Sequence, residues 1–277
     1  MSVISGLNAC VDGINTMGKW TVELSNEVKS WLASNSKRAP GYLPGNFDWS
    51  GSYEAWGYQP LKMPTNEFTF TGSVDGAKGV SGDVVVDSVE ITIGVEAADI
   101  IKHTVEFSGN GALTKADISA ISDVESPEAF TSLGLKAYLG DIAESPLYSE
   151  LSDVRTVTLR FTADNKEYNS SGTSGYTKRL AGNIGGEVTI SVYADSLDDL
   201  PDEGDLAALK VMVTDTLFWE LKWIIFASIG DFAADVKTGD LIGAELSGNF
   251  SGLAFDGSSW LEGEIVRPDS STWWPFT

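Results

Sequence analysis

The sequence contains one cysteine, Cys10, and one histidine, His103. A single cysteine excludes an internal disulfide and any multi-cysteine metal site, and a single histidine excludes the paired-histidine zinc motifs. No serine or cysteine partner suggests itself for His103, so we expect a strand-edge histidine, and we expect Cys10 to act as a small apolar residue. The sequence therefore predicts no catalytic residue, no metal site and no cofactor.

Basic residues are scarce. The 277 residues include 18 lysines and arginines against 40 aspartates and glutamates, which gives a formal charge of −22. Tight contact with nucleic-acid phosphates draws its free energy from basic side chains that release condensed counterions. A chain this acidic should repel such a backbone, so we predict no specific binding of DNA or RNA.

Long apolar runs are also missing. The longest, Trp223 to Ala227, is far shorter than the roughly 20 residues needed to span a bilayer. The segment from Met1 to Gly13 has neither the basic start nor the apolar stretch of a signal peptide. We therefore expect a soluble protein with no membrane partner.

The apolar residues that are present alternate with polar ones. Side chains two apart share one face of a strand, so each alternating segment can bury one face and expose the other. Such segments lie at Lys19 to Leu24, Phe68 to Gly72, Asp83 to Ile93, Thr104 to Phe107, Arg155 to Thr162, Glu187 to Asp195, Trp219 to Phe226 and Leu241 to Leu246. With 29 glycines available for tight turns, this pattern predicts a mainly β fold. Residues 114–153 differ, and their Ala, Leu and acidic content suggests two short helices in a connector.

The sequence also repeats itself. Placing Gly45-Asn46 on Gly182-Asn183, an offset of 137, aligns apolar positions in the preceding segments. The aligned pairs are Trp20 with Val157, Val22 with Leu159, Leu24 with Phe161 and Trp31 with Tyr168. After a small insertion, Glu106 to Asn110 matches Glu245 to Asn249. We predict two copies of one β-sandwich domain, 1–115 and 150–277, joined by a connector at 116–149 with short flanking helices.

Each copy has the same order of parts: an alternating strand, a loop rich in Ser, Asn, Gly and basic residues, and a Gly-Asn strand. The segments are Trp20 to Leu24, Ser34 to Arg38 and Pro44 to Ser52 in the first copy, and Val157 to Phe161, Tyr168 to Gly172, Lys178-Arg179 and Ala181 to Ile184 in the second. This order resembles the tail tube (major tail) proteins of long-tailed bacteriophages, in particular those with a duplicated tube domain.

The resemblance implies a β-sandwich flanked by a helix, and a virion protein made in the host cytoplasm. Its partners would be itself, as trimeric rings with pseudo-sixfold symmetry stacked into a tube, and other tail proteins. DNA would pass through the bore without specific binding. A head-to-tail arrangement of similar domains either closes into rings or extends into filaments, and negative charge on the wall would keep phosphates away.

Two sets of residues are candidates for contacts between subunits or rings. The basic pairs Lys37-Arg38 and Lys178-Arg179 occupy the same loop of each repeat, at 27–46 and 164–183, and could meet acidic surface on a neighbouring domain or ring. Aromatic residues bury a large area with few rotors, and the candidates of this kind are Trp31, Trp49, Tyr168, Trp273 and Trp274. We expect the terminal Trp273-Trp274 to dock on its own or a neighbouring subunit.

Other functions fit parts of the sequence. A head decoration or baseplate protein could share the duplication. Loop tryptophans, Trp56 and Trp260 among them, could stack on sugar rings in a carbohydrate-binding module. The acidic run from Asp195 to Asp205 lacks the ligand order of an EF-hand loop and is interpreted as a solvated loop, with cation binding left open.

Overall fold

The chain folds almost entirely into β-strands. The computed structural model describes residues 10–11, 17–32, 39–57, 60, 62–74, 78–95, 100–117, 132–151, 153–194, 201–214, 217–230, 242–268 and 272–274. Within these ranges the only helices are two short 3₁₀ turns, η2 (Ser132–Gly134) and η3 (Ser171–Thr173). The predicted mainly β fold is confirmed, and all eight alternating segments fall on strands over the residues described.

The strands divide into two series along the chain. The first comprises β1 (Cys10–Val11), β2 (Met17–Trp31), β3 (Gly41–Trp56), β4 (Glu67–Ser73), β5 (Lys78–Gly94), β6 (Lys102–Gly109) and β7 (Thr114–Asp117). The second comprises β8 (Lys136–Gly140), β9 (Tyr148–Leu151), β10 (Val154–Tyr168), β11 (Lys178–Ala194), β12 (Leu206–Thr214), β13 (Leu217–Gly230), β14 (Ile242–Phe250), β15 (Leu253–Phe255), β16 (Trp260–Glu262), β17 (Glu264–Val266) and β18 (Thr272–Trp274).

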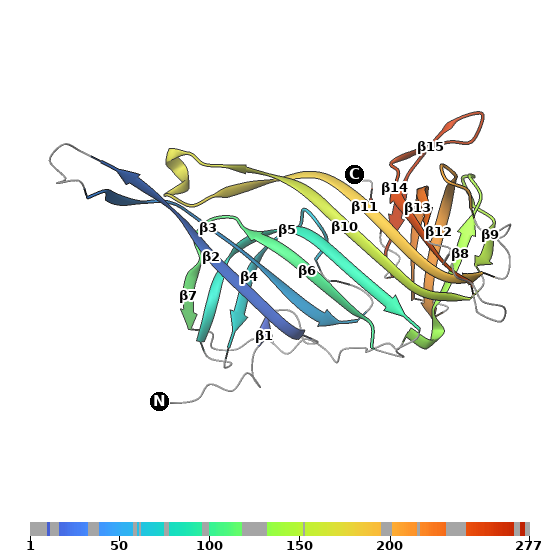
Figure 1. The fold of residues 1–277 in the computed structure, drawn as a ribbon, viewed down its shortest axis with the longest axis horizontal. Coiled ribbons are helices and arrows are strands. Elements are labelled where there is room, and N and C mark those ends of the chain that lie inside the picture. The colour runs from blue at the N-terminus through green and yellow to red at the C-terminus, as the bar shows by residue number, and fades with distance from the viewer. Residues whose placement is uncertain are drawn as a thin grey trace.

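Sixteen of these strands form one sheet, and β15 and β16 form a separate hairpin. The main path runs β2-β3-β6-β5-β10-β11-β14-β13-β12-β8-β9, so the two series meet where β5 pairs with β10. Figure 1 shows β10 lying alongside β5, with β12, β13 and β14 at the far end of the molecule from β7. The two predicted domains are therefore joined by a continuous backbone ladder, and their boundaries remain a prediction.

The core lies on one face of this sheet because the side chains alternate as the sequence predicts. Val157, Leu159 and Phe161 of β10 are fully buried, and Thr158 and Arg160 between them are not. Aromatic residues fill the first half of the core: Phe107 lies 4.7 Å from Phe70 between ring centroids. Burying such side chains stabilises the fold by roughly 1.5–3 kcal/mol each.

The strand order of the first series recurs in the second. The path β2-β3-β6-β5 corresponds to β10-β11-β14-β13, and β4 and β12 flank β5 and β13 in the same way. The pairing registers also agree. Thr21 faces Ser52 where Thr158 faces Thr189, an offset of 137 on both strands. The bulge in β5 between Val86 and Ser88 likewise recurs in β13 between Phe226 and Ser228, an offset of 140.

The registers correct the downstream part of the sequence alignment. Ser50 faces Ser108, and its equivalent Glu187 faces Asn249, which makes Ser108 equivalent to Asn249. The sequence match instead aligned Ser108 with Ser247, two residues away. A shift of two residues keeps every side chain on the same face of a strand, so periodicity alone does not detect it.

Two expectations about irregular segments were wrong. The loops predicted at 27–46 and 164–183 are largely hairpin arms, because β2 continues to Trp31, β3 begins at Gly41, β10 continues to Tyr168 and β11 begins at Lys178. The second half of the predicted helical connector holds the strands β8 and β9, and β8 pairs with β12 at the far end of the sheet. Backbone pairing overrides the weak helical pattern there, and residues 118–131 lie outside the described part of the chain.

Candidate functional site

The face of the sheet opposite the core is polar across seven neighbouring strands. Cross-strand pairing places Lys19, Glu54, Thr104, Glu90, Arg160, Glu187 and Asn249 in one row across β2, β3, β6, β5, β10, β11 and β14. The adjacent row holds Thr21, Ser52, Glu106, Ser88, Thr162 and Gly185. Neither row contains an apolar side chain, and we call this surface the polar face.

Carboxylates outnumber basic groups on the polar face. The acidic members are Glu23, Glu54, Glu90, Glu106, Glu187 and Glu245, against Lys19, Lys102 and Arg160. Glu54 lies 3.8 Å from Lys19 and 3.6 Å from Lys102, so part of the charge is paired. The remaining negative charge lies on a surface whose other side chains are mainly serine and threonine hydroxyls. Such a surface would repel a polyanion and would remain hydrated.

A shallow hollow of about 290 Å³ lies on the polar face beside β2, β3 and β6. The carboxylates of Glu23, Asp87 and Glu106 line it, and two of the three accept hydrogen bonds from neighbouring side chains. Glu106 Oε2 accepts from Ser88 Oγ at 2.7 Å, and Asp87 accepts from Ser108 and Asn165. Across the described ranges no cluster of three or more His, Cys, Asp or Glu side chains could hold a metal ion.

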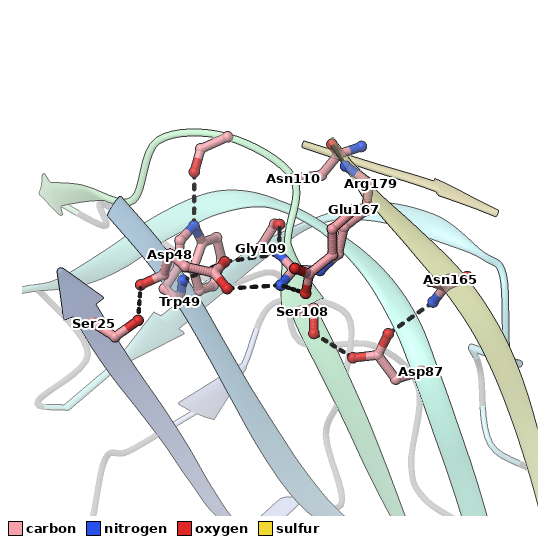
Figure 2. A network of polar contacts seen from close by, with 11 residues as sticks. Ser25, Asp48, Trp49, Asp87, Ser108, Gly109, Asn110, Asn165, Glu167 and Arg179 are labelled. Carbon is pink, nitrogen blue, oxygen red and sulfur yellow. Dashed lines mark hydrogen bonds and ion pairs between the residues drawn. The ribbon is translucent and has the colours of Figure 1, made fainter. Parts of the chain in front are cut away.

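The second polar site joins the two series and is centred on Arg179 (Figure 2). Its guanidinium is 5% exposed and donates to both carboxylate oxygens of Asp48 at 2.8 Å and to Glu167 at 2.7 Å. Asp48 comes from β3 and Glu167 from β10, so one β11 side chain connects both series. We call Arg179, Asp48 and Glu167 the clasp. Such bidentate, charge-assisted bonds are about twice as strong as neutral ones.

Burial lowers the pKa of Arg179, but the hydrogen bond and negative charge of Asp48, followed by those of Glu167, outweigh that effect and raise the pKa overall. The charge is therefore permanent. Main-chain bonds support the same contact: Phe47 donates to Gly175 at 2.7 Å and accepts from Thr177 at 3.0 Å. The β10–β11 hairpin thus rests on β3 through an ion pair and a short stretch of backbone.

Several candidate contact residues make their contacts within the chain. Trp49 is 2% exposed and donates to the Gly111 carbonyl at 2.8 Å, so it is a core residue and its predicted contact role is wrong. Arg179 makes its ion pairs within the chain, across the two predicted domains. The Lys178 ammonium donates to the Asn110 carbonyl of the first series at 2.6 Å.

The remaining candidates are exposed, are only partly described or lie outside the described residues. Trp31 is 51% exposed and Tyr168 is 43% exposed, each at the end of its hairpin arm. The Trp273-Trp274 backbone is in β18, which pairs with β17 of the same chain. Lys37 and Arg38 lie outside the described residues.

His103 is not at a strand edge, because β6 lies between β3 and β5. Its ring is 5% exposed, and Nδ1 lies 3.2 Å from the Gly57 carbonyl. In the acidic run, Asp195 to Leu200 lie outside the described residues. Further along, the Asp205 carboxylate accepts from the Asp202 backbone N–H at 2.9 Å, which is the bond of a turn.

Sequence reasoning missed Asp48 and Glu167. Both lie among polar residues in or near the predicted loops, and their negative charge was the one feature that could have marked them as partners of Arg179. The repeat gave no help, because Asp48 corresponds to Gly185 and Glu167 corresponds to Ser30.

No family model matches this sequence, and no curated protein matches it significantly. In the described part of the chain, no helix has the length and apolar character needed to cross a membrane.

Proposed function

We propose that this protein is a structural subunit that assembles with itself into rings stacked as a tube, namely a bacteriophage tail tube. The polar face would line the bore and guide DNA during ejection. The observation that carries this proposal is the polar face itself: seven neighbouring strands present hydroxyls and a net excess of carboxylates, with the larger apolar cluster of the core behind them. A wall of this kind attracts water and repels phosphates.

The matching registers of the two series support the assembly part of the proposal. We infer that the chain is a tandem of two equivalent units, related by the β5–β10 joint. Three such chains would supply six equivalent units to a ring, and repetition of one joint is what a closed head-to-tail ring requires. The proposal involves no enzymatic step and no cofactor.

A charge reversal on the polar face tests the conduit role. Glu187→Lys combined with Glu245→Lys changes the net charge by about +4 per chain relative to wild type, on β11 and β14. The control, Glu144→Lys with Glu203→Lys, makes the same change on exposed turns away from the face. Both variants and wild type are assembled and mixed with short duplex DNA at low salt. We expect only the face variant to retain DNA, with salt-dependent affinity. Equal retention by both variants would refute a DNA-facing role.

A second candidate, a glycan-binding module, has one observation in its favour. Trp260 of the β15–β16 hairpin is 69% exposed and lies 5.3 Å from Phe255 between ring centroids. The hairpin projects away from the sheet (Figure 1). An exposed aromatic platform can stack on a sugar ring, so retention of wild type but not Trp260→Ala on a glycan resin would favour this function over the tube.

A further inference from the structure

Open edges lie on β2, at one end of the strand path, and on the last residues of β13. Among the described residues, β2 pairs with β3 on one edge and with no strand on the other. On β13, β12 covers one edge up to Ile225, and Phe226 donates to the Asp205 carbonyl just before β12 at 2.9 Å. The following residues 227–230 have no described partner on that edge. Their opposite edge pairs with β14. Open edges of this kind are templates for pairing with another chain.

The pairing of β5 with β10 inside the chain, the internal joint, shows how two such edges form a ladder. β10 runs antiparallel to β5, with Thr162 opposite Ser88 and Phe161 opposite Val89. The registers make β2 equivalent to β10, and Ser228 and Ile229 equivalent to Ser88 and Val89. We infer that β2 of a second copy of this chain pairs with the open edge of β13, with Ser25 opposite Ser228 and Leu24 opposite Ile229. This inference rests on the proposed self-assembly and specifies its contact.

Side-chain exposure at equivalent positions of the two hairpins supports a contact between the β2–β3 hairpin and a second copy. Leu24 is 59% exposed, whereas its equivalent Phe161 is fully buried beside β5. Tyr42 is 64% exposed, whereas its equivalent Arg179 is 5% exposed. The β2–β3 hairpin projects freely at one end of the molecule, while β10–β11 lies over the first series (Figure 1). A second copy would cover the β2–β3 hairpin in the same way that the first series of strands covers the β10–β11 hairpin.

The joint between copies differs from the internal joint in its chemistry. The positions equivalent to the clasp residues Arg179, Asp48 and Glu167 hold Tyr42, Gly185 and Ser30, none of which is charged. The free hairpin instead exposes the apolar side chains Leu24, Val28, Trp31, Tyr42 and Leu43, and its exposed Glu27 and Lys29 pair with each other. The contact between copies is therefore apolar where the internal joint is ionic, and salt should strengthen it rather than dissolve it.

Disulfide trapping tests the register. In a Cys10→Ala background, Ser25→Cys is combined with Ser228→Cys. Directly opposed residues on antiparallel strands have Cα atoms about 4.5–5.5 Å apart, within disulfide range. We expect oxidation to give a ladder of covalent oligomers. Thr162→Cys with Ser88→Cys, the equivalent pair within the chain, should close inside each monomer and shows that the fold is intact. Thr21→Cys with Ser228→Cys is out of register and should give no ladder.

The outcomes separate the register from the proposed function. Assemblies that sediment but give no Ser25–Ser228 ladder overturn the register and leave self-assembly standing. A chain that forms the internal disulfide but stays monomeric at high concentration overturns both. Leu24→Glu should raise the concentration needed for assembly about tenfold, a factor that corresponds to about 1.4 kcal/mol. Leu253→Glu, a change at a similarly exposed leucine on β15, should leave that concentration unchanged. Assembly that disappears at high salt would contradict the apolar contact.

Discussion

Replacing Asp48 with asparagine should destabilise the fold more than removing the arginine that it binds. Asp48→Asn leaves the Arg179 charge in place, 5% exposed, with Glu167 as its one remaining carboxylate. Arg179→Met removes the charge and leaves two carboxylates that water can reach, because the side chains of Asp48 and Glu167 are 34% and 60% exposed. Removing one of the two carboxylates from a buried cation is costly, whereas leaving a hydrated carboxylate without its cation is not.

The magnitude follows from the burial. Breaking a fully buried ion pair costs about 3–5 kcal/mol. Because Asp48 is one-third exposed and Glu167 stays in place, we expect about half of that, roughly 2 kcal/mol, for Asp48→Asn. For Arg179→Met we expect about 1 kcal/mol, mainly because the Gly109 carbonyl loses the donor that it has at 2.5 Å.

Urea unfolding followed by tryptophan fluorescence, at a protein concentration low enough to prevent assembly, measures both values. Glu203→Gln, a neutralisation on an exposed turn, is the matched control and should stay within about 0.5 kcal/mol of wild type. A cost below about 0.5 kcal/mol for Asp48→Asn, or a larger cost for Arg179→Met than for Asp48→Asn, would refute this account of the clasp.

Two further substitutions test the core. Gly109→Ala should lower the free energy of unfolding by about 1–3 kcal/mol, because the added Cβ would lie 2.2 Å from Trp49 Nε1. Gly172→Ala is the control and should be tolerated, because the atom nearest to its added Cβ is 3.7 Å away. Equal urea midpoints for the two variants would contradict this. Burial lowers the pKa of His103, so the unfolded chain binds that proton more readily. The stability from neutral His103 is present above about pH 6.5 and is lost as the pH falls through the folded-state pKa. Since the chain has no other histidine, His103→Gln should flatten stability between about pH 7 and 5, and an unchanged pH profile would argue against the buried neutral ring.

The strands were predictable from the sequence because burial imposes the alternation. Val157, Leu159 and Phe161 are all fully buried, as a period of two requires. Strand length was less predictable. From Glu27 to Trp31 and from Gly41 to Gly45 the hairpin arms are held by backbone pairing, and side chains on both sides of the ladder meet solvent, so hydrophobic periodicity carries no signal there.

The clasp was beyond sequence reasoning for a different reason. Arg179 is buried only because Asp48, 131 residues earlier, lies opposite it in space. A basic pair beside a turn is usually solvated, and no local pattern distinguishes the two cases. The polar face was implicit in the alternation, but its continuity depends on the β5–β10 joint, which periodicity does not specify.

Electron microscopy of the purified protein across a concentration series examines self-assembly most directly. We predict rings or tubes with an open centre and, in averaged maps, the strands β2, β3, β6, β5, β10, β11 and β14 around the bore with their polar side chains facing inward. Single particles at every concentration, or assemblies in which that face points outward, would contradict the account.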